Sequence, residues 1–192
     1  MAAFGVIADT GLSLVALLAK GMIGIFPGGV SVDVLLETPD KFQRHVSPTG
    51  KPTVTVFLYR VAIHSEMRNA ARRVLNDGNT TRPLLPMELF YLITPWAAQP
   101  QIEHLLVGRI LQILYDHSEL SRGDLKGESW SPEDSVQLVL ESLPNTEHYQ
   151  IWDTTKLPYR LSLTYMARVV GIEPTETIQA SPIVEVVLGS GL

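Results

Sequence analysis

The chain has 192 residues, of which 45% are hydrophobic and 18% are charged, and its formal net charge at pH 7 is −5. These values are typical of a folded chain of one domain and differ from those of a disordered segment. Cysteine is absent, which excludes disulfides, zinc–thiolate sites, iron–sulfur clusters and cysteine nucleophiles.

The first apolar run, residues 11–19, is bracketed by Asp9 and Lys20 and is too short to cross a bilayer. No Lys or Arg precedes it, so it also lacks the basic region of a secretory signal. We predict a buried helix that is capped at Asp9 or Thr10 and ends near Gly21. A sheet or another subunit should cover this helix, and we expect no membrane contact.

Two strands are predicted next. Alternating apolar residues indicate a half-buried strand over 30–37, and β-branched and aromatic residues indicate another over Thr53–Ile63. A long polar loop over 38–52 separates them. We expect the two strands to pair antiparallel across this loop.

The densest apolar pattern lies in residues 86–117. It predicts a central strand that is buried on both faces and is ended by Pro95, because proline lacks the N–H of a ladder bond. A helix follows from Pro100, with apolar residues at spacings of three and four that form one broad face. Gly108 is unfavourable in mid-helix by roughly 1 kcal/mol. We attribute it to the close approach of a neighbouring backbone.

The last third of the chain predicts two strands, a short helix and a terminal strand. A strand over Val136–Leu140 precedes a helix over 144–153. Residues 160–169 show the cleanest alternation in the chain, which indicates one buried and one exposed strand face. A loop over 173–182 then leads to a short strand over 183–188.

Together these elements predict an α+β fold, with a mixed, largely antiparallel sheet of five to six strands flanked by helices on one face. We expect a single domain over 1–192, with a basic loop insert at 64–85 and a C-terminal strand and tail at 173–192. Residues 41–82 carry a net charge of +6 in an otherwise acidic chain. An arginine-rich loop of this kind favours an acidic protein partner.

Candidate catalytic chemistry is sparse. The five histidines form no HExxH or other metal-ligand pattern, and no phosphate-binding glycine loop or GxSxG elbow is present. We therefore predict no catalytic, cofactor-binding or metal-binding residue, and no cofactor. One alternative is an enzyme or small ligand-binding domain with His104 or His117 in a pocket. Another is a nucleic-acid-binding module that uses the insert, although the insert lacks aromatic residues that would stack on bases.

A set of short motifs occurs along the chain in a fixed order. The set comprises Leu85–Trp96 (LPMELFYLITPW), Glu103-His104, Leu106-Val107-Gly108, Asp116-His117, Arg68-Asn69, Trp152 and residues 159–165. This set resembles the tail-terminator, or cap, proteins of phage-like contractile injection systems, whose domain was long catalogued as of unknown function. The resemblance covers about residues 5–175. Trp96 stands where Tyr is more usual, and several relatives carry an extra C-terminal region.

The resemblance implies a structural protein that is not an enzyme. It implies a homo-hexameric ring at the end of the particle far from the baseplate, where the ring contacts terminal sheath and inner-tube subunits and stops polymerisation. It also implies assembly in the cytoplasm, in a particle that can be released from the cell. We expect no nucleic-acid partner. The predicted partner-binding residues are Arg68, Arg72, Arg73, Arg82, Ile183, Val184 and Val186.

Overall fold

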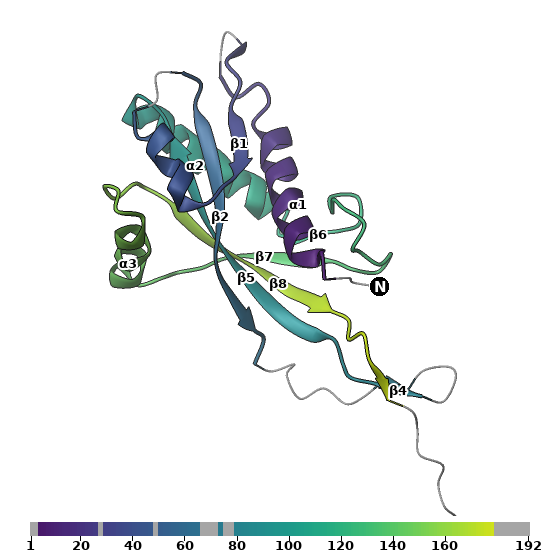
Figure 1. The fold of residues 1–192 in the computed structure, drawn as a ribbon. Coiled ribbons are helices and arrows are strands. Elements are labelled where there is room, and N and C mark those ends of the chain that lie inside the picture. The colour runs from purple at the N-terminus through teal and green to yellow at the C-terminus, as the bar shows by residue number, and fades with distance from the viewer. Residues whose placement is uncertain (1–3, 27–28, 48–49, 66–72, 75–78, 179–192) are drawn as a thin grey trace, which may run out of the picture.

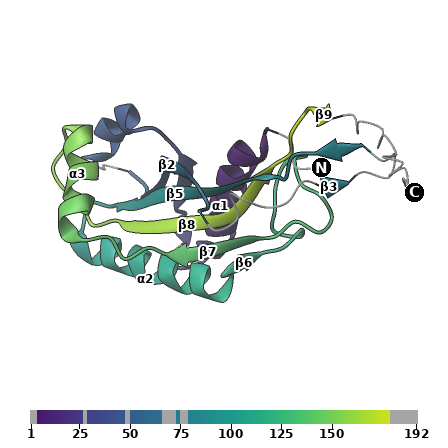
Figure 2. The ribbon, with the colours of Figure 1, turned by 90° about the horizontal axis from the view of Figure 1, so that it is seen from below.

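A six-stranded sheet forms the centre of the computed structural model, which describes residues 4–26, 29–47, 50–65, 73–74 and 79–178. In order across the sheet, the strands are β1 (Asp33–Leu36), β2 (Thr53–Ile63), β5 (Leu85–Trp96), β8 (Leu163–Ile172), β7 (Val136–Leu140) and β6 (Glu119–Leu120). A second, three-stranded sheet contains β3 (Arg73–Val74), β4 (Thr80–Thr81) and β9 (Thr177–Ile178). It lies at the end of a ribbon that projects from the main body (Figures 1 and 2).

The main sheet is mixed, as predicted, but its parallel pair is in an unexpected place. β1 pairs with β2 in parallel, and the other neighbours in this sheet are antiparallel. The predicted antiparallel pairing of these two strands is therefore wrong. The intervening segment contains a 3-10 helix, η2 (Pro39–His45), that returns the chain to the same end of the sheet, and parallel strands need such a crossover.

Two long helices cover one face of the sheet. The apolar faces of α1 (Val6–Gly21) and α2 (Pro100–Asp116) form one core with side chains of β2, β5, β7 and β8. The sheet covers most of α1, so Leu12 is the large apolar side chain of that helix that stays about half exposed. α1 begins before the predicted cap, and Asp9 instead accepts a hydrogen bond from the Ser129 N–H at 3.0 Å.

The explanation predicted for Gly108 is wrong. A Cβ at Gly108 would have nothing within 4 Å, so no neighbour in the described part of the chain requires a glycine there. The close approach occurs at Gly21, at the end of α1, where a Cβ would clash with Ile113 of α2. Arg109 of α2 also donates from Nε to the Gly21 carbonyl at 2.9 Å. Gly21 therefore sets the contact between the two helices.

A smaller aromatic core lies on the opposite face of the sheet, so the prediction that helices cover one face only is wrong. Phe42 of η2, Trp96 of β5 and Trp152 of α3 (Asn145–Thr155) are fully buried together. The Trp96 and Trp152 ring centroids are 6.1 Å apart. Their indole N–H groups donate to Thr55 Oγ1 at 2.9 Å and Ser162 Oγ at 3.0 Å, as buried indoles require.

Two predictions about strands are wrong: the one for the end of β5 and the one for the exposed face of β8. β5 continues through Pro95, which pairs with Val54, and its pairing with β8 ends at Ile93. The missing proline N–H therefore faces an edge of the sheet. On β8, Thr164 is buried and donates to the Glu141 carbonyl at 3.0 Å. The predicted exposed face of this strand is thus covered in the body.

Candidate interaction surfaces

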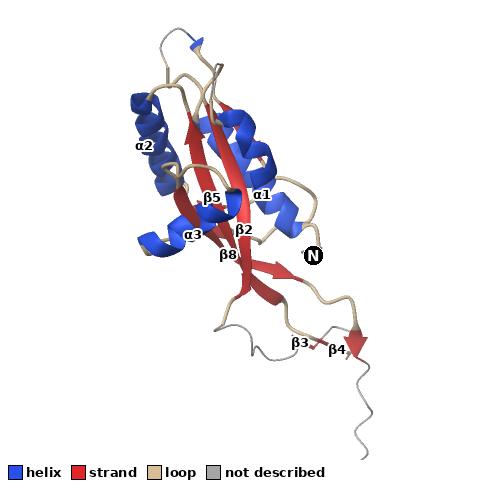
Figure 3. Cartoon of the chain, turned by 60° about the vertical axis from the view of Figure 1, so that its left-hand side comes forward, coloured by secondary structure: helices blue, strands red, loops and turns tan. Residues whose placement is uncertain are grey.

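The arm, as we name the projecting ribbon, consists of residues 60–65, 73–74, 79–88 and 168–178 (Figures 1 and 3). Val61 and Ile63 of β2 lie opposite Leu89 and Met87 of β5, which belong to the core on the helix side of the sheet. Val61, Ile63 and the nearby Leu85 are 45–48% exposed, although Leu89 and Met87 opposite the first two are buried. We call these three residues the apolar strip.

Two of the predicted partner-binding residues, Arg73 and Arg82, lie in the arm. Arg82 follows β4 and is exposed, and the backbone of Arg73 lies in β3. Within the predicted loop insert, Arg73–Val74 pair with Thr80–Thr81 as strands. The other predicted residues lie outside the described part of the chain, and they are Arg68, Arg72, Ile183, Val184 and Val186.

A groove of about 380 Å³ lies between the C-terminal half of α2 and the β7 side of the sheet. Its lining is mainly apolar and comprises Leu111, Gln112, Leu114, Tyr115, Ser118, Leu138, Leu140 and Tyr165. Tyr115 and Leu140 are 82% and 52% exposed. Leu138 donates its N–H to the Ser118 carbonyl at 2.7 Å, which ties β7 to the end of α2. Large apolar side chains at such exposure mark a surface that can accept a partner.

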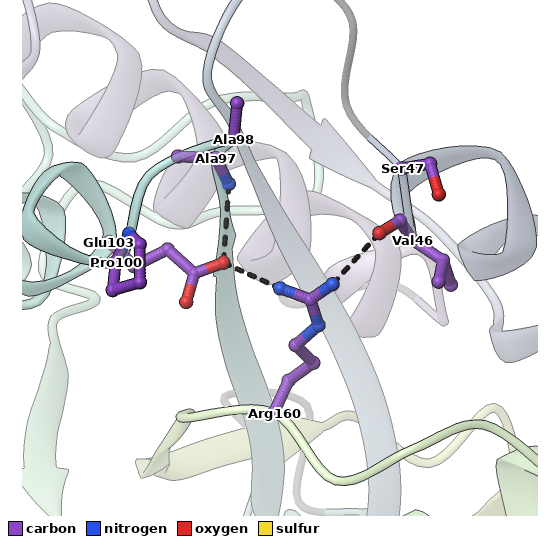
Figure 4. Close-up of a pocket in the computed structure, with 7 residues that line it drawn as sticks. All are labelled: Val46, Ser47, Ala97, Ala98, Pro100, Glu103 and Arg160. Carbon is purple, nitrogen blue, oxygen red and sulfur yellow. Dashed lines mark hydrogen bonds and ion pairs between the residues drawn. The ribbon is translucent and has the colours of Figure 1, made fainter.

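An ion pair spans a second cleft, of about 320 Å³, and joins three segments of the body (Figure 4). Arg160 donates from Nη1 to Glu103 Oε1 at 2.7 Å and from Nη2 to the Val46 carbonyl at 2.8 Å. The same Glu103 oxygen accepts the Ala97 N–H at 3.4 Å, and the guanidinium lies 5.6 Å from the Trp96 ring centroid. Both charged side chains, Arg160 and Glu103, are therefore already paired within the fold. We call this arrangement the clasp.

The two histidines proposed for a pocket lie on the surface. His104 and His117 are exposed, and neither lines the groove or the clasp. His117 Nδ1 lies 3.0 Å from the Ile113 carbonyl, and a histidine at the C-terminal end of a helix can bond a terminal carbonyl in this way. This geometry fits the end of a helix and provides no enclosed site for a substrate.

A serine–histidine pair that the sequence did not predict lies beside α3. Ser162 Oγ lies 2.9 Å from His148 Nε2, but the serine is buried and its hydroxyl also accepts the Trp152 N–H. His148 Nδ1 faces the Tyr159 hydroxyl at 3.4 Å, where a nucleophilic triad would place a carboxylate. Burial lowers the pKa of His148. The pair fastens α3 to the sheet, and its separation of 14 residues leaves no local sequence pattern.

A buried carboxylate ties η2 to the strand before it. Glu37 is buried and pairs with Arg44 and with His45, whose Nε2 lies 2.9 Å from Glu37 Oε2. Burial lowers the pKa of His45, and the neighbouring Arg44 guanidinium lowers it further. Within the described ranges, no three His, Cys, Asp or Glu side chains are grouped so that they could hold a metal ion. No helix there has the length and apolar character needed to span a bilayer.

Two solved structures resemble this fold. One is described as the sheath/tube terminator, in the extended state, of the extracellular contractile injection system PVC, with a TM-score of 0.63 and 20% identity. The other is the tube-terminating cap of the anti-feeding prophage AFP, with a TM-score of 0.64 and 15% identity. The similarity covers 96% of this chain in both cases, but only 62% and 61% of the two relatives. No curated protein matches the sequence.

The sequence itself gives the family. The sequence profile described as the Pvc16 N-terminal domain matches residues 10–185. The α+β fold and the family predicted from the motif set are therefore both confirmed. This chain belongs to the Pvc16 N-terminal domain family, the tail-terminator family that its motifs predict.

Proposed function

We propose that this protein is a structural cap that ends the polymerisation of tube and sheath in a contractile injection particle. The observation that carries the proposal is the match of nearly the whole chain to two solved terminators, one of sheath and tube and one of tube. The chain spans only about three fifths of each relative, so the proposal concerns the shared domain. The buried Ser162–His148 pair and the clasp serve the fold, which agrees with a non-enzymatic role.

The proposed cap acts as a ring of six identical chains at the end of the particle far from the baseplate. A closed ring requires head-to-tail contacts, in which each copy presents two different surfaces. The apolar strip of the arm and the α2–β7 groove are two such surfaces at separate places on one chain. They support the ring, whereas the number six comes from the family resemblance.

Contacts with the sheath and tube are proposed for the arginines of the basic insert and for residues 183–188. Arg68, Arg72 and Arg73 would dock on acidic sheath or tube surfaces, where Arg is a favoured interface residue. The segment 183–188 would add to a sheet edge of its own chain, a neighbouring copy or a sheath subunit. We further propose assembly in the cytoplasm, followed by release of the particle from the cell.

A polymerisation assay tests the cap directly. Tube and sheath subunits should grow to defined ends when the purified protein is added, with rings at those ends in negative-stain images and ring-sized species in light scattering. The Arg68→Glu, Arg72→Glu, Arg73→Glu variant should keep its fold but give particles of irregular length. A control with the exposed Lys20, Lys41 and Lys51 changed to Glu has the same change in charge and should cap normally. A chain that never forms rings, alone or on tube and sheath ends, would overturn the proposal.

A further inference from the structure

We infer that the arm of one copy packs its apolar strip into the α2–β7 groove of the next copy, and that this contact closes the ring. The inference rests on the proposed ring and specifies which two surfaces form it. The occupant of the groove is thus a second copy of this chain, which presents residues Val61, Ile63 and Leu85.

The two surfaces match in chemistry. The strip offers three aliphatic side chains from adjacent strands, each close to half exposed. The groove has room for such side chains, since about 380 Å³ lies between leucine and tyrosine walls. An exposed strip on one copy and an exposed groove on another would both lose apolar surface to water when they meet.

One copy cannot make this contact with itself. Val61 lies in one cross-strand row with Leu89, Ala167 and the groove residue Leu138, so β5 and β8 stand between the strip and the groove. Three strand spacings of about 4.8 Å make this separation roughly 14 Å. The arm also points away from the body (Figures 1 and 3). The sheet therefore holds the strip and the groove apart, and only a second copy brings them together.

The charges beside the two surfaces are complementary. Residues 116–147, which run from the end of α2 past β6 and β7, contain eight carboxylates and two basic residues. Exposed Asp116 and Glu119 adjoin the groove residues Tyr115 and Ser118, and exposed Arg82 lies three residues from Leu85. Opposite potentials of this kind steer association and fix its register.

Cysteine cross-linking tests the contact without background, because the chain contains no cysteine. One sample of full-length chain carries Ile63→Cys and the other carries Tyr115→Cys, and the two are mixed at ring-forming concentration with a short bismaleimide. We expect cross-linked dimers between the two variants. Leu12→Cys is the matched control, since Leu12 is exposed to nearly the same degree as Ile63 but lies on α1. It should not cross-link to position 63.

The outcomes separate this inference from the proposed function. Rings that form without a 63–115 cross-link would overturn the inference and leave the cap intact, as would cross-linking of Ile63→Cys mainly to itself. A chain that stays monomeric under all conditions would overturn both. A second test exchanges the charges of Arg82 and Glu119 and measures the cross-link yield at low salt. Arg82→Glu and Glu119→Lys should each lower the cross-link yield several-fold, and combining Arg82→Glu chains with Glu119→Lys chains should restore it.

Discussion

The body and the arm share β2, β5 and β8, yet the same kind of residue has a different environment in each. In the body, Leu89, Tyr91 and Ile93 are fully buried because α1 and α2 cover that face. In the arm, Val61 and Ile63 lie on the same face, on a part of β2 that β1 no longer accompanies, and they are about half exposed although Leu89 and Met87 opposite them are buried. The comparison teaches that apolar residues left exposed at the side of the sheet identify a surface for partners, and that the covered part of the sheet supplies the stability.

The largest expected effect separates two isoleucines of the same sheet. Ile93→Ala in the body should lower the free energy of unfolding by about 2–5 kcal/mol, because it leaves a cavity in a fully buried site. Ile63→Ala in the arm should cost less than about 1 kcal/mol, since the side chain is 47% exposed. Urea denaturation of both variants measures the difference. Equal losses would contradict the division between body and arm.

The next effect concerns the clasp. Arg160→Ala should cost about 1.5–3 kcal/mol, because it leaves the Glu103 carboxylate, of which 13% is exposed, without its cation. Glu103→Gln should cost less, and the double variant should show a coupling of at least 0.5 kcal/mol, roughly the lower limit for residues in direct contact. A double-mutant cycle measured by thermal denaturation gives the value. Additive effects would mean that the ion pair of Figure 4 contributes little to the body.

The body should also lose stability in mild acid. Burial lowers the pKa of both His45 and His148 from 6.5, so the unfolded chain binds protons that the folded chain does not. Stability is therefore complete above pH 6.5 and falls as the pH drops below it, by at most about 1.4 kcal/mol per pH unit for each histidine. Denaturation midpoints between pH 7.5 and 5.5 measure this slope. The paired change of His45 and His148 to Gln should flatten this slope.

The sequence predicts the body better than the arm. Periodicity places α2 correctly because one apolar face must meet the sheet, and the β-branched and aromatic residues place β2 at Thr53–Ile63. It misplaces the β1–β2 pairing because the crossover depends on Phe42, a single residue that anchors η2 in the aromatic core. It also misses the groove and the strip, because exposure at Leu140 or Ile63 depends on where distant helices end.

The smallest expected change in stability concerns Gly108, in the middle of α2. Gly108→Ala should raise the free energy of unfolding by about 0.5–1 kcal/mol, since alanine favours the helix and a Cβ there would have nothing within 4 Å. Chemical denaturation of the isolated chain measures this gain. Destabilisation of the isolated chain would show that Gly108 has a packing role in the body. A stabilised chain that assembles poorly would instead place this face of α2 at an interface.

Imaging of intact particles that carry a labelled copy of this chain tests the central claim most directly. A cap that closes as a ring predicts label at one end of each particle, opposite the baseplate, with one closed ring on the last layer of tube and sheath. In a reconstruction of that end, the arm of each copy should reach the α2–β7 groove of its neighbour. Label along the whole tube, at the baseplate or at neither end would contradict the account.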